Sequence, residues 1–278
     1  MNKLEHPMTS DLLFKMFFVQ YPNLLKNLIS EVLGIDVKDM NDFNIINPEI
    51  PPDYVGNKFC ILDINMKVNG QRVDLEIQVK NEGDYPERSL YYWARDYSAT
   101  LPEGEEYLEL PRVVIISILN FKLFDGVKYH SEFLPLEKED HTLLTDKMSL
   151  HYFELPKIKG AINKTNTLEL WLRFFKAKTE EDINKLEKLE VKIMKEAITA
   201  YKKVSTSEQY REIERMKLKT KLNEASALGY AERKGMEKGR KEGIEEGMKA
   251  GRKEVAKLEK LLAEKDAEIA RLTKKKNK

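Results

Sequence analysis

Carboxylate and amide side chains recur between Phe59 and Lys80, in the sequence FCILDINMKVNGQRVDLEIQVK. Asn69-Gly70 is the dipeptide best suited to a two-residue type I′ turn, so this segment is predicted to form a β-hairpin. Closing the hairpin at that turn sets Asp63 directly across from Glu76. Opposed residues have Cβ atoms about 4.5–5.5 Å apart, and two carboxylates held that close need a shared proton or a cation. The spacing therefore predicts a divalent metal site.

The same register gives the hairpin one apolar face. Beyond Val68 and Gln71 at the turn, the pairs on that face are Met66 with Val73, Ile64 with Leu75, Leu62 with Ile77, and Cys60 with Val79. On the other face Asn65 lies across from Asp74, and Ile61 across from Gln78. A slip of one residue would exchange the faces and bury the charges. Glu76, Gln78 and Lys80 are therefore expected to align on the carboxylate face as an acid, an amide and an amine.

Periodic patterns on both sides of the hairpin predict the elements that hold it. Thr9, Ser10 and Asp11 offer capping side chains before a short apolar helix, and a second helix is expected between Pro22 and Gly34. Strands are predicted at residues 42–50, 112–119 and 151–155, and a helix at residues 85–100 with Leu90, Trp93, Ala94 and Tyr97 on its inner face. Segment 120–148 shows no clear pattern. We predict an α/β domain, with a mixed β-sheet flanked by helices.

A long helical extension follows this domain. The pattern becomes helical at Asn166, and residues 180–203 read as one charged amphipathic helix. The charge changes sign along the chain: residues 178–278 carry 28 basic and 20 acidic residues, net +8, whereas residues 1–177 carry 20 and 27, net −7. We therefore predict a globular domain at residues 1–177 and a charged helical, coiled-coil region at residues 178–278.

Two repeats mark the C-terminal region. Glycines stand every fourth residue at Gly235, Gly239, Gly243, Gly247 and Gly251. A glycine inside a helix costs roughly 0.5–1 kcal/mol relative to alanine, so the stripe indicates either close helix packing or a region without stable helix. After it, Val255, Leu258, Leu262, Ile269 and Leu272 fit heptad positions a and d, with an interruption at Lys265. This spacing predicts a short coiled coil and a homodimer through the C-terminal helices.

Composition excludes several classes of protein. The single cysteine, Cys60, falls on the apolar face of the hairpin, where a buried structural thiol is expected. The N-terminus lacks the apolar run and cleavage site of a signal peptide, and no stretch approaches the roughly 20 apolar residues that cross a bilayer. We expect a cytoplasmic protein with no membrane association. The four histidines show no ligand spacing: His6, His130, His141 and His151.

Four motifs, taken in order, resemble one family. They are Asp11-Leu12-Leu13-Phe14-Lys15, Ile61-Leu62-Asp63-Ile64, Asp74-Leu75-Glu76-Ile77-Gln78 and Arg88-Ser89-Leu90-Tyr91-Tyr92-Trp93-Ala94-Arg95. The sequence resembles the Rpn recombination-promoting nucleases, which are transposases of the PD-(D/E)XK nuclease superfamily. The acidic pair looks like the D…(D/E)-x-K core, with Gln78 where the lysine usually stands. The resemblance covers residues 1 to about 175 well and the glycine-spaced helix more loosely; it implies a restriction-endonuclease-like core.

What the resemblance implies is metal-dependent cleavage of DNA. Asp63 and Glu76 would hold Mg²⁺ together with the main-chain carbonyl of Ile77. Gln78 would orient the attacking water, and Lys80 would supply the positive charge that the glutamine lacks.

Three further residues are possible accessories to this site. Asp11 is either an outer ligand or a helix cap. Asp74 is an alternative ligand if the hairpin register is shifted by two, and Arg95 would approach a phosphate.

DNA binding raises a difficulty for this interpretation. The first domain is acidic, whereas duplex affinity depends largely on Lys and Arg contacts to phosphates. A basic run either compensates or is a solvated helix face: Lys202, Lys203, Arg211, Arg215, Lys217, Lys219 and Lys221. Two functions therefore stand, beside a third, weaker interpretation in which the protein is mainly a coiled-coil interaction module. One is a Mg²⁺-dependent DNA endonuclease linked to recombination or mobile DNA; the other is a non-cleaving DNA-binding or assembly protein on a nuclease-like scaffold.

Overall fold

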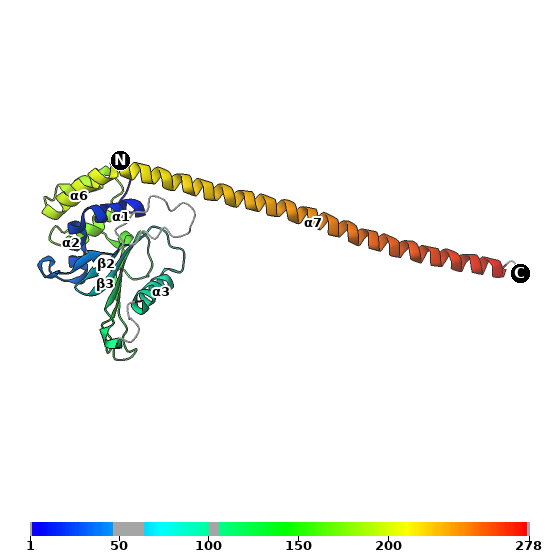
Figure 1. The fold of residues 1–278 in the computed structure, drawn as a ribbon, viewed down its shortest axis with the longest axis horizontal. Helices are drawn as coiled ribbons and strands as arrows, with labels where there is room; N and C mark the ends of the chain where they lie inside the picture. The colour runs from blue at the N-terminus through cyan, green and yellow to red at the C-terminus, as the bar shows by residue number, and fades with distance from the viewer. Residues whose placement is uncertain (1, 47–63, 100–105, 277–278) are drawn as a thin grey trace. The chain divides into compact units, whose positions relative to one another are not determined.

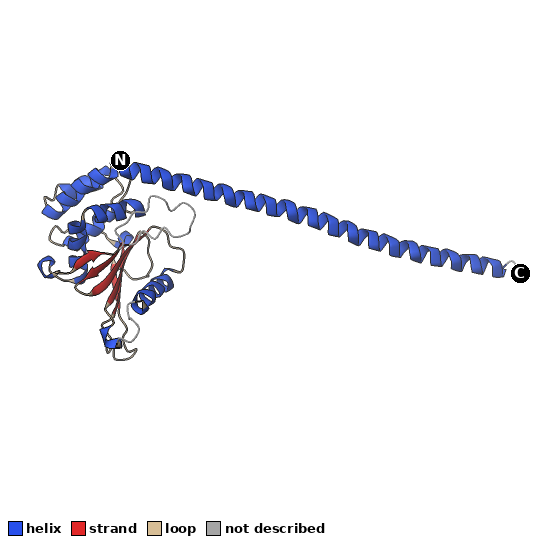
Figure 2. Ribbon diagram, viewed as in Figure 1, coloured by secondary structure: helices blue, strands red, loops and turns tan. Residues whose placement is uncertain are grey.

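The computed structural model describes residues 2–46, 64–99 and 106–276, with side chains as far as residue 270. In this part of the chain a six-stranded β-sheet occupies the centre of the fold (Figure 2). Its strands are β1 (Phe43–Ile45), β2 (Ile64–Val68), β3 (Gln71–Gln78), β4 (Val113–Leu119), β5 (His130–Phe133) and β6 (Met148–Glu154). The spatial order is β1-β2-β3-β4-β6-β5, with β3–β4 and β4–β6 parallel and the other pairs antiparallel. The predicted mixed sheet is confirmed.

Helices cover both faces of this sheet. The helices of the described chain are α1 (Asp11–Gln20), α2 (Pro22–Leu33), α3 (Tyr85–Ser98), α4 (Thr167–Lys176), α5 (Glu180–Glu187), α6 (Lys192–Ser205) and α7 (Glu208–Lys276), with short 3₁₀ turns η1 (Val37–Asp39), η2 (Tyr107–Glu109) and η3 (Leu155–Lys157). Figure 1 shows α1, α2 and α6 on one side of the strands and α3 on the other. Two hydrophobic cores result, a large one against α1, α2 and α4–α6, and a small one beneath α3. The predicted α/β class is confirmed.

The hairpin forms as predicted within the described residues. Asn69 and Gly70 have φ angles of 49° and 78°, as a type I′ turn requires. All five pairs from Val68↔Gln71 to Ile64↔Leu75 have the predicted register. The predicted pairs that involve residues 60–63 lie outside the described residues. Strand β3 ends at Gln78, so the prediction of a strand reaching Lys80 is wrong.

Several local patterns were interpreted correctly. Helix α2 begins at Pro22 and ends before Gly34, whose φ of 65° is the left-handed conformation typical of a helix C-terminus. Strand β4 is buried along its entire length, as its β-branched run predicts. Strand β5 was not predicted, and β6 begins at Met148, three residues before the predicted start.

The inner face of α3 differs from the predicted one. Leu90 and Ala94 are exposed, whereas Tyr85 and Ser89 are buried. Trp93 and Tyr97, which were predicted correctly, pack on the small core. The face of α3 that packs on the sheet carries the hydroxyl groups of Tyr85 and Ser89, because the sheet presents carboxylates there.

The helical region after α4 is also divided differently. Residues 180–203 are not one helix, since α5 and α6 are separated by a turn in which Glu190 has a φ of 60°. Contacts divide the chain into two compact units, Met1–Met216 and Lys217–Lys278. The predicted boundary after residue 177 falls inside the first unit, between α4 and α5.

The glycine stripe lies within α7, so these residues are helical in the structure. A Cβ atom added at Gly235, Gly239, Gly243, Gly247 or Gly251 would meet nothing within 4 Å. In the described part of the chain, no helix has the length and apolar character needed to span a membrane.

Candidate functional site

Strand β3 carries acidic residues on the face that α3 covers. Asp74 and Glu76 are only 5% and 2% exposed, so this polar face is buried. The intervening Val73, Leu75 and Ile77 face the large core. The sheet is covered on both sides here because β3 pairs in parallel with β4, and such sheets bury both faces. Burial of these carboxylates makes their hydrogen-bond partners important for the site.

Glu76 is held by groups from the same strand and from the next helix. The Tyr85 hydroxyl, at the start of α3, donates a 2.6 Å hydrogen bond to Oε2 of Glu76. The Gln78 amide donates a longer one, 3.4 Å, to the same oxygen. The other oxygen, Oε1, accepts no hydrogen bond from the described residues. Glu76 therefore has one carboxylate oxygen fixed in place and one available to a ligand.

Hydroxyl groups from three elements extend this contact into a buried polar cluster. Ser117 lies beside Glu76 in the β3–β4 register, and its hydroxyl is 2.9 Å from that of Tyr85. Tyr152, next to Ser117 on β6, shares a 2.5 Å hydrogen bond with Ser89 of α3. Burial raises the pKa of Tyr152. Tyr152 therefore remains a protonated hydrogen-bonding group at neutral pH.

Sequence reasoning missed these hydroxyl residues, although two signals were present. Ser117 is the one polar residue inside the apolar run of β4. Tyr85 and Ser89 are four residues apart on α3, which places them on one helix face. Nothing in the sequence indicated that this face would meet Ser117 and Tyr152.

Asp74 is the second buried carboxylate of the site. Its Oδ1 atom has no hydrogen-bond partner among the described residues. Burial, together with repulsion from Glu76 and Asp96, raises the pKa of Asp74 well above its usual range. The face between β3 and α3 therefore holds more negative charge than the described residues offset. A carboxyl kept neutral or a bound cation would relieve it.

The other predicted site residues are placed at the margins. Lys80 is exposed and follows the end of β3. Asp11 is exposed in the first turn of α1, where Ser10 is the N-cap residue but makes no side-chain capping bond. Arg95 is exposed near the end of α3 and forms no ion pair with another described residue. Asp63 lies outside the described residues, so the structure brings together Asp74, Glu76 and Gln78 of the predicted set.

The sequence analysis also did not predict a pair of histidines. Nε2 of His130 lies 3.1 Å from Nδ1 of His151, and the Ser149 hydroxyl is 2.9 Å from Nε2 of His151. Burial lowers the pKa of His151 to about 4, so the pair is neutral at neutral pH. It belongs to β5 and β6, away from β3. Among the residues that the structure describes, no three His, Cys, Asp or Glu side chains form a metal-binding group.

Donor chemistry nevertheless fits a hard divalent cation at β3. Glu76 presents an oxygen without a hydrogen bond from the described residues, Asp74 has an unpaired one, and both side chains are buried. Mg²⁺ prefers one or two carboxylates and completes its shell with carbonyl oxygens, waters or substrate phosphate.

Comparison with known protein families identifies a match. The family model described as PD-(D/E)XK nuclease family transposase matches residues 8–231, from just before α1 to within α7. The match includes the hairpin, α3 and the parallel strands that build the site. No curated protein and no solved structure matches the chain significantly.

Proposed function

The chain belongs to the PD-(D/E)XK nuclease family transposases, and on this premise we propose that it is a metal-dependent DNA endonuclease. It hydrolyses phosphodiester bonds in the cytoplasm, in recombination or on mobile DNA. The observation that carries the proposal is the buried Glu76 carboxylate, fixed by Tyr85 through Oε2 while Oε1 stays available. A carboxylate so held at the end of a parallel strand suits a metal ligand better than a surface charge.

Asp63 is proposed as the second carboxylate ligand. The register of β2 and β3, with Ile64 opposite Leu75, is the one from which Asp63 is predicted to lie across from Glu76. The main-chain carbonyl of Ile77 would complete the protein ligands to Mg²⁺, and Asp74 is an alternative ligand. When bound, the cation would act as a Lewis acid that activates water and offsets negative charge on the phosphate.

The remaining chemistry belongs to side chains of this protein. Gln78 has an amide near Glu76 and would orient the attacking water by hydrogen bonding. It carries no charge, so Lys80 would approach the phosphate from just beyond the strand. Asp11 and Arg95 are the less favoured accessory residues, because both are exposed.

Plasmid nicking tests the proposal. Purified protein with Mg²⁺ is expected to relax supercoiled DNA, and EDTA to stop it. Asp63→Asn and Glu76→Gln should each lower the rate by at least about 10³-fold, as expected when a ligand to a catalytic metal is lost. Glu109→Gln, at an exposed acid in η2, is the matched control and should cleave normally. Full cleavage by both site variants would refute the assignment.

The second candidate is a non-cleaving DNA-binding or assembly protein on this scaffold. It is favoured by Gln78, which stands where the family's lysine is usual. It predicts salt-sensitive DNA binding that EDTA and Glu76→Gln leave unchanged, with no nicking by the unmodified protein. The nicking and binding assays together separate the two functions.

We further propose that the chain forms a homodimer through α7. Val255, Leu258, Leu262 and Ile269 are exposed on the single chain and keep the 3,4 spacing of a coiled-coil seam. A second copy of the same helix would bury this seam.

A further inference from the structure

A basic cavity lies at the carboxyl ends of β4 and β6. Its volume is about 640 Å³, and its polar lining consists of Asn120, Arg173, Lys176, Lys178, Asp182 and Lys185. Asn120 directly follows β4, and Pro156, which also lines the cavity, follows β6 by two residues. The cationic residues come from α4, α5 and the segment between them. The cavity is thus bounded by strand ends on one side and by cations on the other.

This cavity begins beside the candidate metal site. The backbone N–H of Asn120 donates a 2.8 Å hydrogen bond to the carbonyl oxygen of Gln78, at the end of β3. Strands β3, β4 and β6 are consecutive in the sheet and parallel, so their carboxyl ends share one edge. Neighbouring strands are about 4.8 Å apart, so β6 lies about 10 Å from β3.

Positive charge in the cavity exceeds negative charge. Asp182 is the one acidic residue in the lining, and it already accepts hydrogen bonds from the backbone N–H groups of Lys178 and Thr179. Lys176 gives one hydrogen bond, 2.6 Å, to the carbonyl of Ile158, which leaves two ammonium hydrogens. Burial, followed by repulsion from Arg173 and Lys178, lowers the pKa of Lys176. An anion in the cavity would offset that repulsion.

Arg173 makes the cavity a fixed structure rather than a cluster of mobile side chains. Its Nε donates a hydrogen bond to Oε1 of Glu169. Its Nη2 donates hydrogen bonds to the carbonyl oxygens of Lys159, Gly160 and Ala161. The loop that follows η3 is thereby held against α4. A second cavity, of about 470 Å³, is lined by Lys122, Lys157 and Lys159 together with Asp125, and Lys157 is paired there with the buried Glu154.

We propose that this cavity binds the phosphodiester backbone of DNA beside the bond that is cleaved. Lys176 and Lys178 contact the phosphates, while Arg173 holds the wall on which they stand. The proposal rests on the proposed function, since the substrate class is the same. It also explains how a domain with a net charge of −7 over residues 1–177 holds a polyanion. Affinity comes from a local basic edge, not from the overall charge.

The test is a salt titration of DNA binding with the full chain. Binding of a fluorescein-labelled duplex is followed by anisotropy in EDTA, so that cleavage does not interfere. Each lost phosphate contact reduces the slope of log K against log salt by about 0.9. Lys176→Gln/Lys178→Gln is expected to raise Kd about tenfold at 0.1 M salt and to reduce the slope by between about 1 and 2.

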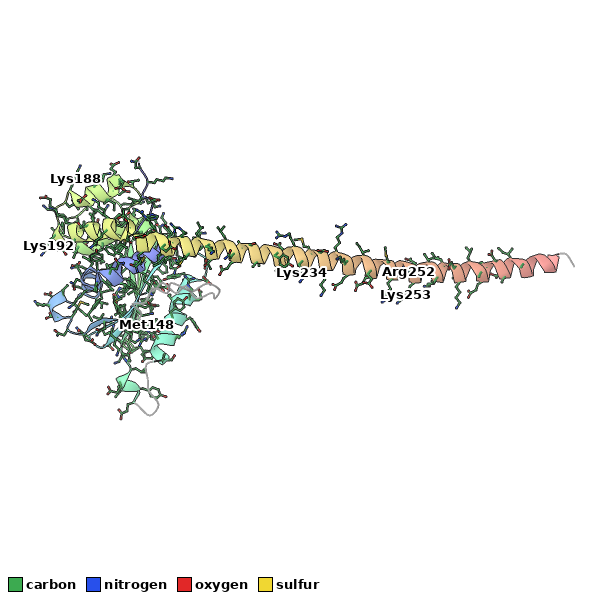
Figure 3. The ribbon with its side chains drawn as sticks, turned by 45° about the horizontal axis from the view of Figure 1, so that its top comes forward. Met148, Lys188, Lys192, Lys234, Arg252 and Lys253 are labelled. Carbon is green, nitrogen blue, oxygen red and sulfur yellow. The ribbon has the colours of Figure 1, made fainter. Side chains whose placement is uncertain are left out.

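A matched control removes the same charge elsewhere on the same helical region. Lys188→Gln/Lys192→Gln changes two exposed lysines outside the cavity (Figure 3) and should leave Kd and slope unchanged. If the double variant unfolds, Lys178→Gln alone replaces it in the test, because Lys178 is exposed. This single variant should reduce the slope by about 0.9. Equal slopes for the cavity variants and the control would overturn the proposal, as would absence of salt-dependent binding by the unmodified chain.

If the chain is not an endonuclease, the experiments give a result different from failure of the cavity proposal. An unmodified chain that binds DNA but never nicks it refutes the endonuclease, while the slope comparison still decides the role of the cavity. Conversely, Glu76→Gln should lose nicking and keep both Kd and slope.

Discussion

The hydroxyl group of Tyr85 lies 2.6 Å from Oε2 of Glu76 and donates a hydrogen bond to it, which joins the first residue of α3 to the buried acid of β3. The two residues are nine positions apart, and the connecting turn brings the helix back over its own strand. Arg88 adds a cation 4.9 Å above the Tyr85 ring. Tyr85 is therefore a positioning residue for the proposed metal ligand.

Tyr85→Phe should weaken both stability and metal use. The free energy of unfolding, measured with urea in EDTA, is expected to fall by about 1–3 kcal/mol, because a buried carboxylate loses its shorter hydrogen bond. Loss of a group that orients a ligand typically costs 10- to 100-fold in metal affinity, so half-maximal nicking should need about that much more Mg²⁺. Tyr91→Phe, at an exposed tyrosine of the same helix, is the control. An unchanged Mg²⁺ dependence would contradict the positioning role.

Positions 78 and 80 should be interchangeable as places for a positive charge. Lys80→Met is expected to lower the nicking rate by about 10²-fold, the usual size of an electrostatic contribution from one donor. Gln78→Lys should raise the rate of the unmodified protein and largely restore Lys80→Met. Gln78→Met, which introduces no charge, serves as the control and should restore nothing. If Lys80→Met cleaves normally, another cation faces the phosphate.

Asp74 should make stability decrease as pH rises. Its folded-state pKa is raised by burial and by the charges of Glu76 and Asp96, so the folded protein binds a proton that the unfolded chain has already released. Stability is then greatest below the unfolded pKa near 4 and declines as pH increases toward the raised folded value.

Asp74→Asn removes this titration and tests it. In EDTA at pH 8 the variant should be more stable than the unmodified protein by about 1–3 kcal/mol, the usual cost of a buried unpaired polar group. Its urea midpoint should also change less between pH 5 and pH 8. Asp125→Asn, at an exposed acid, should behave like the unmodified protein. A midpoint that rises with pH in the unmodified protein would contradict a raised pKa.

Truncation should show where the folded unit ends. Helices α5 and α6 bury apolar side chains in the large core, and Ile183, Leu186, Met194, Ile198 and Val204 are nearly inaccessible. Each such burial contributes about 1.5–3 kcal/mol, which together is comparable with the stability of a whole domain. A chain ending at Met216 should therefore unfold cooperatively in urea, whereas one ending at Ala177 should not. Cooperative unfolding of the shorter chain would instead support a domain of residues 1–177.

Charges placed on the α7 seam should separate the proposed dimer. Leu258→Lys/Leu262→Lys introduces two lysines at adjacent core positions and is expected to halve the mass measured by light scattering after gel filtration. Ala256→Lys/Ala263→Lys adds the same charge on the outer face of the heptads and should leave the mass unchanged. A monomeric unmodified protein would refute the dimer.

Local signals were sufficient for the hairpin and its neighbours. Asn69-Gly70 can adopt positive φ angles at little cost, so the turn type and the register of β2 and β3 follow from the dipeptide and the alternation around it. The near-continuous β-branched run of β4 and the Pro22 and Gly34 boundaries of α2 are equally local. The four motifs also indicated the family to which the chain belongs.

Where local signals were weak, the interpretation failed. The break between α5 and α6 occurs at Glu190, which adopts a left-handed conformation without the glycine that usually announces it. Strand β5 is four residues long and depends on its pairing with β6. On α3, exposed Leu90 and Ala94 follow a plausible apolar pattern, but the covering surface needed Tyr85 and Ser89 instead.

The sequence by itself determined which acids and amide share a face of the hairpin, because side chains of a strand alternate with a period of two and the turn sets the register. Only the tertiary structure decided that this face is buried and that Tyr85, Ser117 and Tyr152 meet there. It also gathered Arg173, Lys176 and Lys178 at the edge next to Gln78. Contacts between distant segments depend on how α3 and α4 pack on the sheet, and no local spacing encodes that packing.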